Sequence, residues 1–363
     1  MLKNIILNLF RFLVGGLFIF SGLIKVNDPV GTSIKLQEYF DVFSHDIAPF
    51  FQVLKEFALP IGIILIVLEV GLGVMLLLNF KAKLTVKLLM ALILFFTFLT
   101  FYSAYFDKVT DCGCFGDAIK LTPWESFYKD IILLVMIGIL FIYRKQLPKA
   151  QGKWIQGAVL VSLILPLVLS IYAVRNLPFI DFRAYKEGVD IREAMQPSGT
   201  LEYRYIMKKD GEEVVLEEYP TDESYEFVDM QLKNPEVLPK IADFAVWNDS
   251  GDYTDYVLEG NKILILISNF EKMDKSKLDL LAPLVEQQDI ETVIVTASSA
   301  EEIESLLQEK KWNVPYYYGD ATVVKTMIRA NPGIILLQNG RIIKKYHINN
   351  TPQLEEVKRL LTP

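Results

Sequence analysis

The first half of the chain alternates long apolar stretches with short charged ones. A helix needs about 20 mostly apolar residues to cross a bilayer. Five stretches qualify: Ile5–Val26, Phe57–Leu78, Leu84–Ala104, Phe127–Tyr143 and Ile155–Val174. Each is expected to be a helix, because lipid offers the backbone no other hydrogen-bond partner. The first stretch is too long for the core of a signal peptide and lacks an Ala-x-Ala cleavage site, so we interpret it as an uncleaved span.

After Asn176 the pattern changes to short strands and amphipathic helices. Leu201–Met207 and Glu213–Tyr219 alternate polar and apolar residues and predict a β-hairpin. From about Ile241 the chain alternates strands with helices, which is typical of an α/β sandwich. The predicted extended segments are Lys262–Ser268, Glu291–Thr296, Val314–Tyr318, Gly333–Leu337 and Ile342–Tyr346. The predicted helices are Asp274–Gln288, Ala300–Lys310, Ala321–Arg329 and Pro352–Leu361.

The chain is therefore predicted to be a membrane α-helical bundle followed by a soluble α/β domain. We expect a four-helix membrane domain in residues 1–148 and a fifth transmembrane helix in 149–176. A linker region with the hairpin follows in 177–240, and the α/β domain occupies 241–363.

The composition changes along the chain in the same sense. The whole sequence is 52% hydrophobic with a mean hydropathy of +0.30, which is apolar for a soluble protein. Residues 175–363 instead hold 22 Lys and Arg against 33 Asp and Glu. An acidic half argues against nucleic acid as a partner, because a phosphate backbone requires clustered Lys and Arg. The predicted partners are the lipid bilayer and other proteins.

The charges of the loops predict the orientation in the membrane. Three segments are basic and contain no acidic residue; their cations are Lys3, Arg11, Lys81, Lys83, Lys87, Arg144, Lys145, Lys149 and Lys153. The two other links are rich in acidic residues, namely Asp28, Glu38, Asp41, Asp46, Glu56, Asp107, Asp111, Asp117 and Glu125. Basic segments stay in the cytoplasm, so the N-terminus is predicted to be cytoplasmic. Five crossings then place the C-terminal half in the periplasm, outside the cell inner membrane.

The only two cysteines, Cys112 and Cys114, lie in one of the predicted outer loops. Outside the cytoplasm a pair of thiols can be oxidised and remain so. The ring closed by Cys-Gly-Cys is very small, and Gly113 supplies the backbone freedom that such a ring requires. A strained disulfide is easily reduced, which favours an exchanging pair over a structural one. Cys112 and Cys114 are therefore the predicted catalytic residues.

Two other interpretations of this loop remain open. The pair could be a structural clip, although so short a ring would stabilise the fold little. It could also bind a soft metal such as Cu(I) or Zn. Two thiolates leave a tetrahedral ion short of ligands, and the two histidines, His45 and His347, are far apart in the sequence.

Glu69 lies in the middle of the second predicted span. A carboxylate there is costly unless it is paired or protonated, so it is expected to face the interior of the bundle. Arg11 in the first span is the expected partner. The pair is either structural or a polar site for a proton or the head group of a quinone. A second group of charges, Lys25, Asp28, Lys129 and Asp130, is expected to anchor helix ends at the membrane interface.

Three elements of this half resemble the DoxX/MauE group of membrane proteins, in the form found in Bacteroidetes. They are residues 20–29, Leu68-Glu69-Val70-Gly71 and Cys112-Gly113-Cys114-Phe115-Gly116. The resemblance covers about the first 145 residues and implies a four-helix bundle comparable in role to DsbB and the vitamin K epoxide reductases. MauE is implicated in making a disulfide-rich enzyme subunit, and DoxX relatives act in quinone-linked thiosulfate oxidation. Quinone is thus the cofactor that the resemblance implies, but this chain lacks the second cysteine pair of those enzymes.

The order of elements over residues 240–363 resembles the thioredoxin fold, in its TlpA-like branch. Asn331-Pro332 before a strand matches the loop where thioredoxins place a cis-proline that contacts a peptide, so both residues are candidate partner-binding residues and the bond is predicted to be cis. Where the family has Cys-x-x-Cys, this chain has Asn269-Phe270-Glu271-Lys272. The domain is therefore expected to dock a partner without thiol chemistry of its own.

Two functions follow from these features. The first is a membrane redox or maturation factor in which Cys112 and Cys114 exchange with the thiols of an exported client protein. The second is a non-catalytic assembly or scaffold protein whose thioredoxin-like domain docks the client. A transporter of small solutes is less favoured, because the sequence has few intramembrane charges and no inverted repeat.

Overall fold

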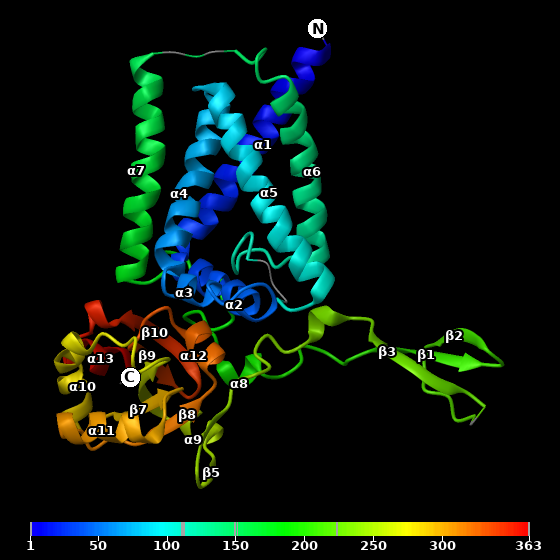
Figure 1. Cartoon of the computed structure of the whole chain (residues 1–363). Helices are drawn as coiled ribbons and strands as arrows, with labels where there is room; N and C mark the ends of the chain where they lie inside the picture. Colours follow the sequence, from blue (N-terminus) through cyan, green and yellow to red (C-terminus); the bar gives the residue numbers. More distant parts are fainter. Residues whose placement is uncertain (1, 110–112, 149, 151, 223, 362–363) are drawn as a thin grey trace. The chain divides into compact units, whose positions relative to one another are not determined.

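The computed structural model describes residues 2–109, 113–148, 150, 152–222 and 224–361 (Figure 1). The chain forms two compact units, Met1–Phe182 and Arg183–Pro363. The first is a bundle of helices and the second contains the β-sheets, as the sequence predicts for the fold class.

Four helices of the first unit are long and apolar enough to cross a membrane. They are α1 (Leu2–Asn27), α4 (Ala58–Leu77), α5 (Ala82–Phe106) and α7 (Lys153–Arg175). The remaining predicted span is the 20-residue helix α6 (Pro123–Ile142). Its first turns carry Glu125, Lys129 and Asp130, so its uninterrupted apolar part is only residues 131–142. Four of the five predicted spans thus meet the criteria of length and composition, and the crossing by α6 stays a prediction.

Glycines bring the bundle helices together. A Cβ atom on Gly73 of α4 would lie 2.8 Å from the backbone oxygen of Gly15 in α1. A Cβ on Gly22 would lie 2.5 Å from the Val70 side chain, and one on Gly71 would lie 2.4 Å from Leu163 of α7. Small residues allow this close approach because lipid supplies no hydrophobic force between helices. The same α1–α4 contact fixes which residues of the two helices face each other.

The sequence pattern did not predict the helices α2 (Pro29–Asp46) and α3 (Phe51–Glu56) between α1 and α4. The start of α2 is nevertheless encoded locally, because Asp28 accepts a hydrogen bond from the Gly31 amide at 2.8 Å and Pro29 occupies the first turn. Tyr39 and Phe43 of α2 pack in a buried cluster with residues of α5. The link is therefore folded over the end of the bundle.

The second unit contains a seven-stranded sheet in the order β10-β9-β6-β7-β8-β4-β5. The strands are β4 (Val246–Asn248), β5 (Gly251–Asp252), β6 (Asn261–Ile267), β7 (Glu291–Thr296), β8 (Tyr316–Gly319), β9 (Gly333–Gln338) and β10 (Arg341–His347). Strands β6, β7 and β8 are parallel, whereas β9, β10 and β4 run antiparallel to their neighbours. Strand β6 is central and almost wholly buried. This is a thioredoxin-like α/β fold, and the five predicted extended segments all form strands in it.

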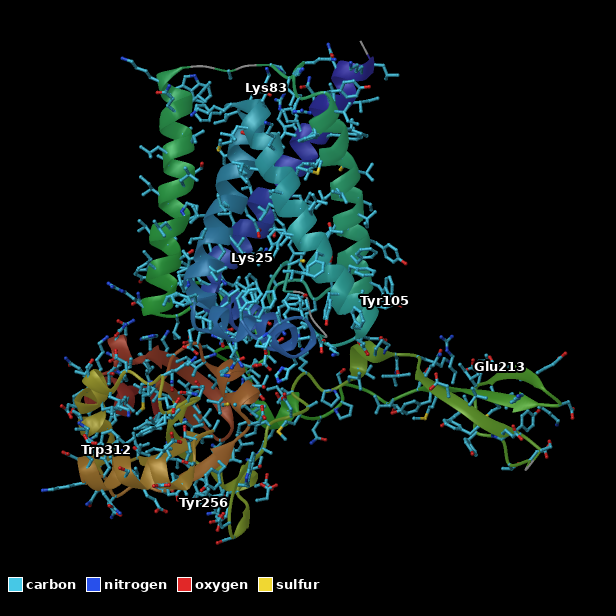
Figure 2. All side chains as sticks on the ribbon, in the orientation of Figure 1. Lys25, Lys83, Tyr105, Glu213, Tyr256 and Trp312 are labelled. Carbon is cyan, nitrogen blue, oxygen red and sulfur yellow. The ribbon has the colours of Figure 1, made fainter. Side chains whose placement is uncertain are left out.

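The α-helices that alternate with these strands are α9 (Thr254–Leu258), α10 (Ala282–Glu286), α11 (Ala300–Lys310), α12 (Ala321–Met327) and α13 (Leu354–Leu361). One predicted helix, Asp274–Gln288, is wrong over its first half. Residues Lys275–Leu281 form a 3-10 helix, and a short α-helix follows. Pro283 explains the break, because proline has no amide hydrogen and its ring clashes with the preceding turn of an α-helix. Trp312 packs beside these elements in the buried core (Figure 2).

The predicted hairpin is present as β1 (Tyr203–Lys209) and β2 (Glu212–Leu216). A third strand, β3 (Glu226–Leu232), pairs with the other edge of β1 and was not predicted. Most of β3 is exposed on both faces, so it lacks the alternation by which a half-buried strand is recognised. The order of this small sheet is β2-β1-β3.

The segment just after Arg183 covers the outer edge of the larger sheet. The amide of Gly188 bonds to the oxygen of Ile342 at 2.7 Å, and the amide of Ile342 bonds to the oxygen of Val189 at 2.8 Å. The short helix α8 (Ile191–Ala194) follows directly. An unpaired edge strand is a template for unwanted pairing, and this segment satisfies the free groups of β10.

Candidate functional site

The loop that joins α5 to α6 carries the predicted redox pair. Cys112 lies outside the described residues, so the structure gives the position of Cys114 alone. Cys114 is partly exposed. Gly113 and Gly116 adopt φ angles of 65° and 51°, in the left-handed region that glycine occupies without strain. Phe115 is buried, and its ring lies 5.8 Å from that of Phe20 in α1. The aromatic contact holds the loop against the bundle.

Glu69 faces the interior of the bundle, as predicted, and is only 1% exposed. Its partner is Lys25 of α1, whose Nζ lies 2.5 Å from Oε1 of Glu69. The Ser21 hydroxyl lies 3.0 Å from Oε2 of the same carboxylate. The same hydroxyl is 2.9 Å from the backbone oxygen of Cys114. One buried cluster therefore joins α1, α4 and the cysteine loop.

The predicted pairing of Glu69 with Arg11 is wrong. Arg11 donates to Oδ1 of Asn8 at 2.8 Å and lies 3.4 Å from the oxygen of Leu77. The glycine contacts set α1 antiparallel to α4, so Gly22 faces Val70 whereas Arg11 faces the opposite end of α4. At 1.5 Å per residue, the 14 residues between Arg11 and Lys25 span about 21 Å of helix. Lys25 was expected at the membrane interface and is instead 8% exposed inside the unit (Figure 2).

The expected role of Asp130 at the interface is wrong as well. Its side chain is buried, forms an ion pair with Lys129 and accepts a hydrogen bond from Thr100 of α5 at 3.0 Å. Lys129 also lies over the ring of Phe115, 5.6 Å from its centre. A second polar contact between helices thus borders the cysteine loop, on the side of α5 and α6.

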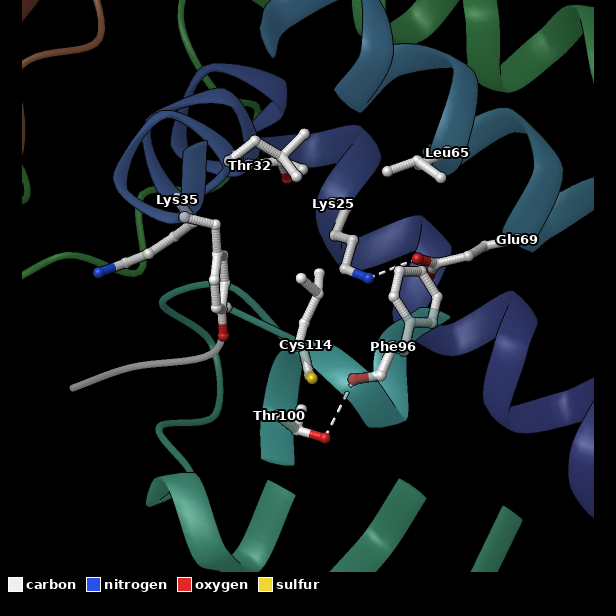
Figure 3. A pocket seen from close by; sticks show the side chains of 12 residues that line it. Lys25, Thr32, Lys35, Leu65, Glu69, Phe96, Thr100 and Cys114 are labelled. Carbon is white, nitrogen blue, oxygen red and sulfur yellow. Dashed lines mark hydrogen bonds and ion pairs between the residues drawn. The ribbon is translucent and has the colours of Figure 1, made fainter. Parts of the chain in front are cut away.

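A pocket of about 50 Å³ is lined by Lys25 and Glu69 of the first polar cluster and by Thr100, which bonds to Asp130 of the second (Figure 3). Its lining combines charged and hydroxyl groups with apolar side chains: Lys25, Thr32, Lys35, Leu36, Tyr39, Leu65, Glu69, Phe96, Leu99, Thr100, Gly113 and Cys114. The space suits a few water molecules, because a cavity of about 10–15 Å³ is enough for one. Cys114 and the Lys25–Glu69 pair line the same small space.

Helix α2 is tied to the start of the cysteine loop through Asp46. Its carboxylate pairs with Lys108 at 2.6 Å and accepts a hydrogen bond from the Tyr102 hydroxyl. The Lys108 hydrogen bond, followed by that of Tyr102, lowers the pKa of Asp46 below its ordinary value. Asp46 is therefore ionised at neutral pH and holds Lys108, four residues before Cys112.

The predicted loop of the thioredoxin-like domain is present, and the Asn331–Pro332 bond is cis as predicted. The Asn331 side chain donates to the oxygen of Asn269 at 2.6 Å and accepts from the amide of Ser268 at 3.1 Å. Pro332 is buried. The Asn331 side chain thus holds the segment where thioredoxins carry cysteines. Contact of this loop with a partner stays a prediction.

In the part of the chain that the structure describes, which excludes Cys112, there is no group of three or more His, Cys, Asp or Glu that could hold a metal ion. The sequence analysis missed Lys25, Ser21 and Thr100 as members of the site. A lysine in the last turn of an apolar helix has the same sequence signal whether it reaches the interface or turns inward. Only the packing of α1 on α4 shows that Lys25 turns inward.

Comparison with known proteins agrees with this architecture. Residues 3–143 match the family described as Methylamine utilisation protein MauE. This part of the chain is thus similar to a MauE-type membrane domain. This match contains all the residues of the buried cluster and the cysteine loop, and the DoxX side of the predicted resemblance stays a prediction.

A curated relative matches part of the chain. Protein TlpB of Flavobacterium psychrophilum is 30% identical over 164 residues, which are 42% of this chain and 41% of TlpB. The chain thus matches about two fifths of the length of this relative. No solved structure shows a significant match to the chain.

Proposed function

We propose that this protein is a membrane redox or maturation factor whose Cys112 and Cys114 exchange with the thiols of an exported partner protein. The observation that carries the proposal is the Cys-Gly-Cys loop, held by Phe115 and by Ser21 beside a buried ion pair in a MauE-type bundle. A clip for stability alone would need neither the buried charges nor the pocket behind Cys114.

The exchange conserves atoms and electrons. With the loop oxidised, a client thiolate attacks one loop sulfur, the Cys112–Cys114 bond breaks, and a mixed disulfide forms. A second client thiolate then attacks this mixed disulfide. The client leaves as a disulfide, and the loop retains two electrons and takes up two protons as a dithiol. A lipid quinone, the acceptor that the family resemblance implies, would take these electrons and protons to become a quinol and restore the loop disulfide.

We further propose that the loop and the C-terminal domain lie on the outer face of the inner membrane, with the N-terminus in the cytoplasm. The support is the distribution of charges, with basic segments at one end of the helices and acidic segments at the other. In this arrangement the thioredoxin-like domain binds the client on the side where the loop reacts. The segments proposed as separate domains are residues 1–148, 149–176, 177–240 and 241–363.

Trapping of mixed disulfides tests the exchange. C112A and C114A variants are produced at native level in membranes, quenched with acid and separated without reductant. We expect one variant to form a covalent adduct with a specific exported protein, and the adduct to vanish on reduction. The double variant C112A/C114A is the control, because the chain has no other cysteine. If neither variant forms an adduct and thiol labelling finds the native pair permanently oxidised, exchange is excluded.

A non-catalytic scaffold is the second candidate. The observation that favours it is the loop at Asn269–Lys272, which has no thiol although it adjoins the cis-proline. A scaffold would capture its client equally well in the native chain and in C112A/C114A. An exchange factor would lose its covalent adduct in that variant.

A further inference from the structure

The exchange proposed above gives no role to the buried cluster of Lys25, Glu69 and Ser21 beside Cys114. We propose that the Lys25–Glu69 ion pair sets how readily Cys114 becomes a thiolate, with Ser21 holding the loop against the pair. This inference rests on the proposed exchange chemistry, and it names Lys25, Glu69 and Ser21 as positioning residues that tune the reactive sulfur.

The ion pair is poorly explained by stability alone. The side chains of Lys25 and Glu69 are 9% and 2% exposed, and their charged atoms lie 2.5 Å apart. Removing two charges from water costs several kcal/mol per ion, which their attraction only partly offsets, so apolar residues of similar volume often stabilise as well or better. The position of the pair, at the end of the bundle that carries the cysteine loop, points to a role in that loop.

Ser21 couples the pair to the loop. Its hydroxyl has one hydrogen but lies within hydrogen-bonding distance of two acceptors, Oε2 of Glu69 at 3.0 Å and the backbone oxygen of Cys114 at 2.9 Å. The two acceptors therefore share or compete for this hydrogen. A change in the charge of Glu69 therefore changes the hydrogen bond from Ser21 to the Cys114 backbone oxygen. A movement of the loop likewise changes the hydrogen bond from Ser21 to Glu69.

Pairs of opposite charges surround the pocket. Lys25, Lys35, Glu69 and Tyr39 line it together with Cys114, and the Lys35 ammonium is paired with Glu38 at 2.9 Å. On the other side, α6 contributes Lys129 over the Phe115 ring and Asp130, which bonds to the pocket residue Thr100. Three cations thus stand against three carboxylates, so the effect on Cys114 depends on where each charge lies and not on a net charge. An adjacent cation stabilises a thiolate and an adjacent carboxylate opposes it, so Lys25 and Glu69 act on Cys114 in opposite senses.

The consequence for exchange is direct. When the loop is reduced, the Cys114 thiol gives its proton to water, and the thiolate attacks a disulfide sulfur of the partner. One sulfur–sulfur bond forms, one breaks, and the released partner thiolate takes up a proton. When the loop is oxidised, the same ammonium stabilises Cys114 as the leaving thiolate. In both directions the ion pair changes the rate of exchange, because it changes the stability of the Cys114 thiolate.

The opposite action of the two charges makes the inference testable. In a C112A background Cys114 is the only thiol of the full chain. The rate of alkylation of reduced membranes by a small, uncharged iodoacetamide is measured against pH. We expect K25M to raise the pH of half-maximal labelling by about one unit and E69Q to lower it by about half a unit. K25R, which keeps the charge, is expected to restore the native midpoint.

Two further variants separate charge from structure. K83M removes an exposed cation at another part of the unit (Figure 2) and is expected to leave the midpoint unchanged. S21A leaves every charge in place, so we expect a nearly native midpoint but a faster maximal rate, because the loop is held less tightly. If K25M does not fold, E69Q still decides, since its amide keeps the shape of the carboxylate.

Equal or parallel shifts in K25M and E69Q, or shifts no larger than that of K83M, overturn the inference. The outcome is independent of the trapping experiment. Adducts without midpoint shifts leave the exchange function intact and remove the inference. Midpoint shifts without adducts keep the tuning of Cys114 and remove the exchange with a client.

Discussion

Gly73 shows how much a single residue decides in this bundle. Its missing side chain lets α4 meet the backbone of α1 at Gly15, and this contact sets the register that brings Glu69 to Lys25 and Ser21. The sequence predicted that Glu69 is buried, because a carboxylate in an apolar span must avoid lipid. It did not predict the partner, because hydropathy contains no information on the register between two helices.

We therefore expect G73A to destabilise the membrane unit. Its Cβ would lie 2.8 Å from the Gly15 oxygen and 3.2 Å from the Ile19 nitrogen, and neither backbone atom can move alone. Overpacking of this kind costs roughly 1–3 kcal/mol. The measurement is the thermal aggregation midpoint of the full chain in detergent. G16A is the matched control, because a Cβ there meets nothing within 4 Å, and an equal loss in both variants would contradict the prediction.

At the level of elements, the periodicity of the sequence was sufficient wherever an element has a continuous buried side. Strands β6 and β7 and helix α11 lie within a residue of their predicted bounds, because each is buried along one side or throughout. The helix before Gln287 and the strand β3 were not predicted correctly. Pro283 interrupts the first, and β3 has no buried face. The hydrophobic pattern thus fails to predict an element where a proline interrupts a helix or where a strand has no buried face.

An ion pair between two neighbouring strands gives a pH dependence at this scale. Lys262 of β6 and Glu291 of β7 are register partners, with Nζ 2.5 Å from Oε2. Burial raises the pKa of Glu291, but the hydrogen bonds from Lys262 and Tyr256 outweigh it and hold the pKa below its ordinary value. A carboxylate with a depressed pKa stabilises the fold above its unfolded pKa, and this contribution is lost as the pH falls through the folded pKa.

We accordingly expect E291Q to lower the urea midpoint of the thioredoxin-like unit at pH 7, by the equivalent of about 0.5 kcal/mol, because the Glu291 side chain is 36% exposed. The difference from the native chain should shrink as the pH is lowered from 5 to 3. Fluorescence of the full chain in detergent, which includes the buried Trp312, follows the transition. E309Q, whose carboxylate is 72% exposed and 4.0 Å from Lys310, serves as control. A difference that is constant with pH would refute the assignment.

At the level of the whole molecule, the proposed function requires the cysteine loop and the thioredoxin-like domain to lie on one side of the membrane. Helices α1, α4, α5 and α7 have the length and composition of spans. The side of the C-terminal domain then depends on whether α6 crosses as well. Asp130 bonds to Thr100 and Lys129 lies over the Phe115 ring inside the unit, which supports a crossing with Asp130 turned away from lipid.

This topology predicts which positions an impermeant maleimide can reach. In a C112A/C114A background, E217C in the second unit should be labelled in intact spheroplasts, whereas K83C at the start of α5 should be labelled only after permeabilisation. In the native chain, reduced Cys112 and Cys114 should react from outside. Labelling of both engineered positions on the same side would show that α6 does not cross, whereas labelling of K83C but not E217C in intact spheroplasts would show that the orientation is reversed.

The sequence by itself determined the apolar helices, the change to an acidic α/β half, the cis-proline loop and the absence of thiols beside it. Each of these depends on local composition or on a motif within a few residues. Only the tertiary structure decided that Lys25, not Arg11, pairs with Glu69, and that Ser21 joins this pair to the Cys114 backbone. The reason is physical: glycine contacts between α1 and α4 fix the register, and a shift of one helical turn would give the carboxylate a different partner.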